Sequence, residues 1–437
     1  MSKTGLLGDR FVSWRNRMPQ DWETSPVKYA TRMNAEVLSE TTKPDFEFDY
    51  LDIGNVSDEG QVLGVERMRF DAAPSRARRV LNTCDVLIST VRTYLKAVAH
   101  APKVTSPLVC STGFAVLTPR TNLDSRFLFY WARSSFFVGE VVGRSTGVSY
   151  PAINPSDLGQ LPVPAIPFEQ QRRIAAFLDA KLGRLDELMR KKERQLALLA
   201  EKRQALISHA VTRGLNPNAP TKHSGIEWLG NIPAHWDVKR LKYVAASVQT
   251  GSTPPTSEAR LFSEDGVKWF TPGDFSPDGR LTDSARYVSE AAVVEGFVER
   301  FSAPVILIVS IGATLGKIGL SEDDCCCNQQ INAVRIRQPN SSYYFCHLLT
   351  VLAKFMMASA NQATLPIFNQ TQARNLPVLA PPPEEQATIV AWLDGQLTRM
   401  ARTADLVARQ LTKLHEYRQS LITAAVTGQV AIPEEAA

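Results

Sequence analysis

The sequence predicts an α+β fold in which two similar globular domains follow one another, each ending in a long helix. Three observations lead to this prediction: the length of the chain, an internal repeat and a heptad pattern. The chain has 437 residues, and a single hydrophobic core stops growing at about 250 to 300 residues, so at least two domains are expected. Its 44% hydrophobic and 21% charged residues form an ordinary globular composition.

The internal repeat is the main signal, because a fixed offset marks one structural unit that occurs twice. The segment LPVPAIPFEQQRRIAAFLDAKLGR at Leu161 returns as LPVLAPPPEEQATIVAWLDGQLTR at Leu376, an offset of 215 residues. Held without a gap from Leu161 to Thr212, that offset gives 25 identities in 52 positions. Further matched pairs lie upstream: Pro19 with Pro233, Trp22 with Trp236, Tyr29 with Tyr243, Pro151 with Pro366, and Asn154 with Asn369.

Each copy ends in a stretch whose apolar side chains alternate three and four residues apart, the pattern of a coiled-coil seam. Prolines lie only upstream of these stretches, at Pro167 and at Pro381 to Pro383, where a helix can begin. We therefore expect two helices of about 45 residues, each about 65 Å long. The seam contains Leu178, Leu182, Leu185, Met189, Leu196, Leu199, Leu206 and Ala210 in the first copy, and Leu393, Leu397, Met400, Ala404, Val407, Leu411, Leu414, Leu421 and Ala425 in the second.

Basic residues interrupt the seam, with Lys192 in the first copy and with Arg203 and Arg418 at the same register in both. One interpretation is that their aliphatic stems lie along the helix pair while their charges reach solvent. The other is an ion pair with a carboxylate, on the partner helix or on another subunit, which would set the register or help to dock a partner.

The rest of each copy is rich in short β-like runs broken by Gly, Pro, Asn and Asp, which predicts an α+β domain. The expected strands are DVLISTV at Asp85, GFAVLTP at Gly113, VILIVSI at Val305 and INAVRIR at Ile331. The expected helices include SRFLFYWARSSFFV at Ser125 and YYFCHLLTVLAKFMMA at Tyr343.

Composition and termini favour a cytoplasmic protein. The first residues, MSKTGLLGDRFVSWR, lack the apolar core of a signal peptide, and the longest apolar run, Val305 to Ile311, is too short to span a bilayer. A net charge of +5 fits a polyanion partner without requiring one. The six cysteines fit neither zinc spacing nor a secreted disulfide framework, and those at 325, 326 and 327 would point to alternating faces of a strand, so we expect structural thiols.

The sequence lacks the motifs of an enzyme. A DNA methyltransferase needs Asn or Asp before Pro-Pro and an aromatic residue, and neither TPPTS at Thr253 nor APPPEEQ at Ala380 fits. The stretch GATLGKIG at Gly312 departs from a phosphate-binding loop in its spacing and at Ile318, where a magnesium-binding hydroxyl is required. We expect no catalytic residue, metal site or cofactor in this chain, which disfavours a self-sufficient DNA-modifying enzyme.

Several motifs together resemble one family. The helices open with PFEQQRRIAAFLD and PPPEEQATIVAWLD and close with LISHAVTRG and LITAAVTGQ, and GIEWLGNIPAHWDVKRLKYVA precedes the second domain. Over nearly its whole length the chain resembles the specificity subunits of type I restriction-modification systems. The resemblance implies a non-catalytic subunit in which each globule is a target recognition domain for one half of a split double-stranded DNA sequence. The two helices would then pack as an antiparallel coiled coil.

The resemblance also implies partners and domain boundaries. Two methyltransferase subunits would dock on the helices and bring S-adenosylmethionine, and a restriction subunit, where one accompanies the complex, would bring ATP and Mg. The expected boundaries are 1–165 for target recognition domain 1, 166–213 for spacer helix 1, 214–380 for target recognition domain 2, 381–428 for spacer helix 2 and 429–437 for a tail. Two similar domains suit half-sites about one DNA turn apart, near 34 to 36 Å.

Base readout needs Arg, Asn, Gln, hydroxyls and aromatics that reach the major groove, so we look for them in loops that follow strands and precede the long helices. An ordinary surface role remains open for each candidate. The alternative for the whole chain is a coiled-coil scaffold, which would lack salt-dependent DNA affinity. The candidates are Arg92, Tyr94, Lys96, Arg144, Thr146 and Tyr150 in the first domain, and Thr314, Lys317, Gln329, Gln330, Gln362 and Thr364 in the second.

Overall fold

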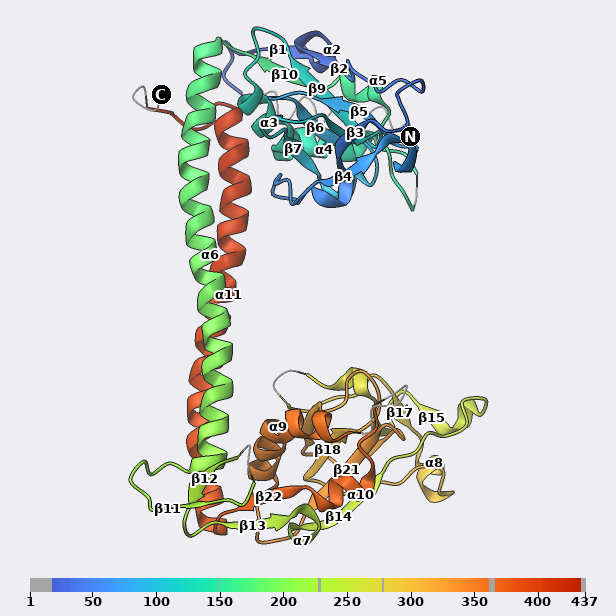
Figure 1. Cartoon of the computed structure of the whole chain (residues 1–437), viewed down its shortest axis with the longest axis vertical. Helices are drawn as coiled ribbons and strands as arrows, with labels where there is room; N and C mark the ends of the chain where they lie inside the picture. Colours follow the sequence, from blue (N-terminus) through green and yellow to red (C-terminus); the bar gives the residue numbers. More distant parts are fainter. Residues whose placement is uncertain (1–17, 148, 227–228, 277–278, 361–365, 434–437) are drawn as a thin grey trace. The chain divides into compact units, whose positions relative to one another are not determined.

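The computed structural model describes residues 18–147, 149–226, 229–276, 279–360 and 366–433. The chain forms two compact units (Figure 1): unit 1 contains Met1–Glu193 and Ala408–Ala437, and unit 2 contains Arg194–Val407. Both boundaries fall inside the long helices, α6 (Phe168–Arg213) and α11 (Pro383–Val426). The sequence treats these helices as segments of their own, whereas the compact units each take half of both.

Unit 1 is built on two four-stranded sheets that share a core. The first has the order β2-β9-β6-β7 and is antiparallel throughout, and the second has the order β4-β3-β8-β5, with β3 and β8 parallel. The first sheet contains β2 (Thr31–Met33), β6 (Val86–Ser89), β7 (Val98–His100) and β9 (Phe114–Pro119). The second contains β3 (Glu47–Leu51), β4 (Glu66–Arg69), β5 (Ala77–Leu81) and β8 (Leu108–Ser111), and a separate pair joins β1 (Glu23–Pro26) to β10 (Pro162–Ala165).

Unit 2 repeats this plan. Its antiparallel sheet has the order β14-β21-β18-β19, and its second sheet has the order β15-β17-β16-β20, with β16 and β20 parallel. The strands are β14 (Ala245–Thr250), β18 (Val305–Val309), β19 (Ile318–Ser321) and β21 (Ile331–Ile336), then β15 (Phe262–Ser263), β16 (Val267–Phe270), β17 (Tyr287–Val288) and β20 (Cys325–Cys327). Separate pairs join β13 (Asp237–Arg240) to β22 (Pro377–Ala380), and β11 (Thr221–His223) to β12 (Asn231–Pro233). The predicted tandem of α+β domains is confirmed.

Helices cover the sheets, and one prediction about them is wrong. The expected helix over 125–138 is two helices, because Ser134 leaves the helical region with ψ 149° and its hydroxyl accepts from the Phe137 amide to cap a second helix. The α-helices outside α6 and α11 are α2 (Val27–Ala30), α3 (Ser125–Arg133), α4 (Ser135–Arg144), α5 (Pro155–Gly159), α7 (Leu241–Val244), α8 (Glu290–Val294), α9 (Ser342–Ser359) and α10 (Gln370–Asn375). The 3₁₀ turns are η1 (Ile53–Asn55), η2 (Phe70–Ala72), η3 (Thr93–Leu95), η4 (Ala259–Leu261) and η5 (Pro272–Asp274).

The long helices complete the core of each unit. In unit 1, buried Leu178 of α6 and Ile422 of α11 belong to one hydrophobic cluster, so the first half of α6 lies with the last half of α11. In unit 2, Ile207 of α6 and Leu393 of α11 share the other large cluster. Within each unit the helices therefore run antiparallel, as the resemblance implies.

A buried glutamine joins the start of each long helix to its domain. Gln171 is 1% exposed; its Nε2 donates to the carbonyls of Asn122 and Ile166 at 2.9 and 2.8 Å, and its Oε1 accepts from the Asp124 amide at 2.8 Å. Gln386, 215 residues later, makes the same kind of contacts in unit 2, with Asn340 Oδ1, the Pro381 carbonyl and the Ser341 amide.

The basic residues in the seam differ in their surroundings. Arg418 is buried, and its Nη1 lies 3.0 Å from Asp186 Oδ1 on α6 and 2.9 Å from Glu59 Oε1 in the globular domain. This confirms the ion-pair interpretation for Arg418. Lys192 and Arg203 are half-buried.

The three consecutive cysteines of β20 are buried on alternating faces, as a strand requires. Cys325 and Cys327 pack in one hydrophobic cluster and Cys326 in another. Burial raises the pKa of Cys325 and Cys326 to about 12, so these thiols are protonated and behave as small apolar side chains.

Candidate nucleic-acid interface

In unit 1, loops that are far apart in sequence meet at one end of the antiparallel sheet. The Ile153 amide donates to the Thr90 carbonyl at 2.9 Å, and Val91 forms an isolated bridge with Ala152. The side chains of Thr93 and Ser145 share a hydrogen bond of 2.7 Å. We call residues 90–97, 145–147 and 149–153 loop cluster 1.

Unit 2 has the same arrangement. The Phe368 amide donates to the Ser310 carbonyl at 2.8 Å, Ile311 bridges Ile367, and the Ser310 amide donates to the Gln330 carbonyl at 2.7 Å. We call residues 310–317, 328–330 and 366–368 loop cluster 2. The bridges Val91 to Ala152 and Ile311 to Ile367 occupy equivalent places, so the backbone framework of the cluster is repeated.

Loop cluster 1 presents a stacked arginine and tyrosine to solvent. The guanidinium of Arg92 lies 4.8 Å from the ring centre of Tyr150, which is 65% exposed. Arg92 and Lys96 both have left-handed backbone conformations, with φ of 48° and 55°, and they flank the exposed Tyr94. Such conformations are rare for residues with a Cβ and are found at functional loops more often than elsewhere.

The other two candidates in unit 1 behave differently from each other. Thr146 is exposed, and its backbone forms two hydrogen bonds of 2.9 Å with Ala152, which hold the loop closed. Arg144 is half-buried, and its Nη2 lies 3.1 Å from Oε2 of the buried Glu140 on α4. Arg144 therefore helps to hold the end of α4.

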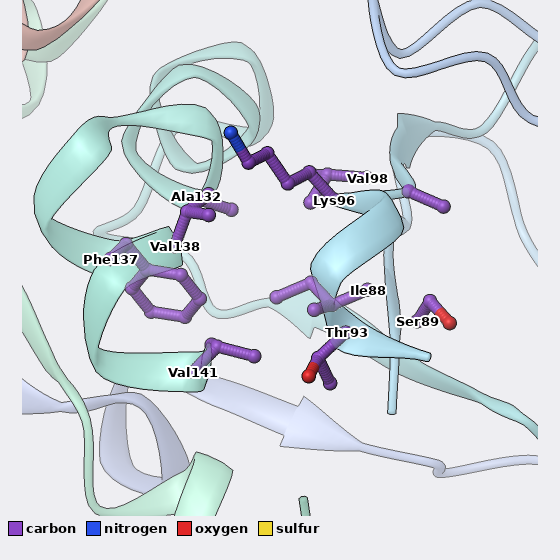
Figure 2. Close-up of a pocket in the computed structure, with 10 residues that line it drawn as sticks. Ile88, Ser89, Thr93, Lys96, Val98, Ala132, Phe137, Val138 and Val141 are labelled. Atoms are coloured by element: carbon purple, nitrogen blue, oxygen red, sulfur yellow. The ribbon is translucent and has the colours of Figure 1, made fainter. Parts of the chain in front are cut away.

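Figure 2 shows the underside of this loop. Thr93 and Lys96 face Phe137 and Val141 of α4, with Ile88 of β6 below them, around a cavity of about 10 Å³. A cavity of that size holds at most about one water molecule. The loop is therefore packed on α4 and leaves no room there for a small-molecule substrate.

In loop cluster 2, Thr314 and Lys317 are exposed in the turn between β18 and β19, and Lys317 Nζ donates to the Pro272 carbonyl at 3.3 Å. Gln329 is exposed and hydrogen-bonds to the Thr253 hydroxyl. Gln330 is half-buried, and its Oε1 accepts from Asn328 Nδ2 at 3.1 Å. The remaining candidates, Gln362 and Thr364, lie outside the described residues.

Sequence reasoning missed side chains that only strand pairing brings to these clusters. Thr253 was considered only as part of a failed methyltransferase motif, yet it contacts Gln329, 76 residues later. Ser145 holds Thr93 across 52 residues. No local pattern indicates either contact, because each depends on the register of strands that are distant in sequence.

The two clusters offer the chemistry of DNA contact. Guanidinium, ammonium, amide, hydroxyl and phenol groups can bind phosphates and the edges of bases. Among the described residues, no group of His, Cys, Asp and Glu is placed to hold a metal ion, and no helix is long and apolar enough to cross a membrane.

Comparisons with known proteins agree with the fold and with the clusters. The family model described as "Type I restriction modification DNA specificity domain" matches residues 233–404. The StySPI specificity subunit of Salmonella potsdam is 22% identical over 443 residues, which cover 95% of this chain and 90% of that protein. The MjaIX specificity subunit of Methanocaldococcus jannaschii is 21% identical over 338 residues, or 75% of this chain and 74% of that protein.

Two solved structures extend the similarity to three dimensions. A chain from a study of complex assembly and conformational transition in the type I restriction-modification system aligns with a TM-score of 0.77 and 25% identity, covering 94% of this chain and 99% of that one. The HsdS subunit of Thermoanaerobacter tengcongensis aligns with a TM-score of 0.54 and 25% identity, covering 94% and 98%.

The tandem of α+β domains with antiparallel helices, together with two repeated loop clusters, defines a recognition protein rather than an enzyme. The chain belongs to the specificity subunits of type I restriction-modification systems, a non-catalytic family whose catalytic activities reside on partner subunits.

Proposed function

We propose that each loop cluster reads one half of a bipartite double-stranded DNA sequence, loop cluster 1 in a target recognition domain at 1–165 and loop cluster 2 in one at 214–380. The observation that carries this proposal is the repeated framework with different side chains. The Val91 and Ile311 bridges hold equivalent loops, but one cluster carries Arg92 and Tyr150 where the other carries threonine, lysine and glutamines. Equal scaffolds with unequal side chains suit two different half-sites.

The same proposal includes the partners. Two methyltransferase subunits bring S-adenosylmethionine to the chosen site in the cytoplasm, and a restriction subunit, where present, brings ATP and Mg. The spacer helices at 166–213 and 381–428 and the tail at 429–437 contribute no base contacts. The chain selects the address, and its partners perform the chemistry.

The test maps methylated bases in cells that carry the complete system and either the unmodified chain or a loop variant. Arg92→Ala with Tyr150→Ala is expected to relax one half-site only, and Lys317→Ala with Gln329→Ala the other. A lost base contact costs about 1–3 kcal/mol, or roughly tenfold or more in discrimination. The matched control is Lys413→Ala, which removes an exposed cation of α11 outside both clusters and should leave the methylated motif unchanged.

Two outcomes would contradict the proposal. A methylation pattern that survives deletion of the gene would favour the scaffold alternative, in which the purified chain shows no steeply salt-dependent DNA affinity. Relaxation of both half-sites by either loop variant would show that the clusters do not read separate halves.

A further inference from the structure

A second surface is repeated in both units, at the opposite end of each antiparallel sheet. Tyr29 on α2 is 65% exposed and Tyr243 on α7 is 64% exposed, which is unusual for a large aromatic ring and occurs at matched positions. Lys28 Nζ lies 4.9 Å from the ring centre of Tyr29, and Lys242 Nζ lies 5.3 Å from that of Tyr243.

An arginine is repeated beside each pair. The Arg120 amide donates to the Ala30 carbonyl at 3.0 Å, directly after Tyr29, and the Arg337 amide donates to the Val244 carbonyl at 2.8 Å, directly after Tyr243. Both arginines are exposed. We call Lys28, Tyr29 and Arg120 patch 1, and Lys242, Tyr243 and Arg337 patch 2. Within the described parts of the chain, these four cations have no ion pair with a carboxylate.

Strand pairing separates each patch from its loop cluster. In unit 1, Ser89 pairs with Phe114 at the loop-cluster end of β9, whereas Thr31 pairs with Pro119 at the patch end. Five residues of strand separate the ends by about 17 Å. The patch therefore lies at the other end of the sheet from the side chains proposed to read DNA.

Unit 2 has the same separation. Val309 pairs with Ile331 at the loop-cluster end of β21, and Ala245 pairs with Ile336 at the patch end. The patches also differ from the loop clusters in composition. Both patches consist of lysine, tyrosine and arginine, whereas the two loop clusters carry different side chains.

Resting on the proposed function, we infer that patches 1 and 2 each dock one copy of the same protein partner, the methyltransferase subunit. A ligand read by identical residues in both units must itself be present twice and be the same each time, which two different half-sites are not. The chemistry of the patch calls for a partner surface with carboxylates around a socket for the tyrosine ring. Tyrosine and arginine are the side chains that most often anchor protein interfaces.

The experiment counts methyltransferase subunits bound to the full chain, by native mass spectrometry of co-expressed complexes, and measures their affinity by titration. Lys28→Glu with Tyr29→Ala is expected to reduce two bound subunits to one, and Lys242→Glu with Tyr243→Ala to do the same. All four changes together should leave none. At each altered patch the affinity should fall at least about tenfold, as for interface anchors.

The matched control is Arg92→Glu with Tyr150→Ala, which removes an equally exposed pair of cation and ring from loop cluster 1. That variant should lose DNA affinity and keep both methyltransferase subunits. Thermal unfolding checks that each variant folds, and Lys28→Gln and Lys242→Gln provide milder changes of exposed or half-exposed side chains.

Three results would overturn the inference. Patch variants that keep two subunits with unchanged affinity would show that the partner docks elsewhere. Patch variants that keep both subunits but lose DNA affinity would make the patches backbone contacts to DNA. An unmodified chain that takes up no methyltransferase at all would refute the proposed function itself, and this inference with it.

Discussion

Arg418 is the residue at which both long helices and the first globular domain meet. Beside its ion pairs with Asp186 and Glu59, it lies near Arg133, which is also buried, and burial followed by the charge of Arg418 lowers the pKa of Arg133 to about 10. Arg133 is still protonated at neutral pH, so two cations share this site with two carboxylates. Gln419 Nε2 donates to the Arg133 carbonyl at 2.8 Å and ties the same turn of α11 to α3.

Removing this arginine should loosen the end of α11. Arg418→Ala leaves Asp186 and Glu59 without their cation, and breaking a buried pair costs about 3–5 kcal/mol, less here because both carboxylates are partly exposed. We expect a loss of about 2–3 kcal/mol. Hydrogen exchange of the backbone amides of 415–426 measures it.

The control is Arg203→Ala, the equivalent change in unit 2. Arg203 is half-buried, so the expected loss is smaller and confined to unit 2. Equal losses at the two positions would mean that burial of the ion pair does not set the stability of unit 1.

At the scale of elements, each long helix is attached at both of its ends to globular domains. Its first turn is held by Gln171 or Gln386, and its last turn ends at a glycine with φ of 72°, Gly214 or Gly428. A Cβ on Gly428 would lie 2.7 Å from Pro19 and 3.0 Å from Trp22. The glycine permits both the left-handed turn and the close approach of the first described segment of the chain.

The glutamine anchors should matter more than their position on a surface helix suggests. Gln171→Ala removes three hydrogen bonds and leaves the Asp124 amide and two carbonyls without those partners, which costs about 2–3 kcal/mol. Urea unfolding of the whole chain, followed by a probe in unit 1, measures the loss. Gln195→Ala, an exposed position on the same helix, is the control and should change the unfolding free energy by less than about 0.5 kcal/mol. A variant at 171 as stable as that control would contradict the anchoring role.

At the scale of the whole molecule, the repeat makes one helix end interchangeable with the other. Residues of α11 that complete the core of unit 1 have identical counterparts at the end of α6: Leu421 with Leu206, Ile422 with Ile207, Ala425 with Ala210, and Val426 with Val211. Each domain thus provides a seat that either helix end can occupy.

A half chain should therefore pair with itself. A fragment of residues 1–213 lacks α11, but the end of α6 in one copy can fill the seat on the domain of another. We expect a dimer by sedimentation velocity, because the alternative exposes the apolar seat to water. The same fragment with Ile207→Asp and Val211→Asp should lose the dimer. A folded, monomeric fragment without these substitutions would contradict the interchangeability of the helix ends.

Much of the architecture could be predicted from the sequence because its signals are local or periodic. The offset of 215 residues predicted two copies, the heptads predicted helices that begin beside Pro167 and among Pro381–Pro383, and alternating apolar runs predicted β6, β9, β18 and β21. The identity of neighbouring side chains determines such features, since period and turn chemistry are properties of short segments.

Only the tertiary structure decided which distant segments meet. The break at Ser134, the division of each long helix between two units, the burial of Arg418 and the contact of Thr253 with Gln329 all depend on packing between residues far apart in the chain. The loops of the candidate interface were identified from sequence, but whether Arg92 stacks on Tyr150 or Arg144 turns back to Glu140 was not. The physical reason is that strand register and helix packing are set by the whole core, and a single sequence position carries little information about its distant partner.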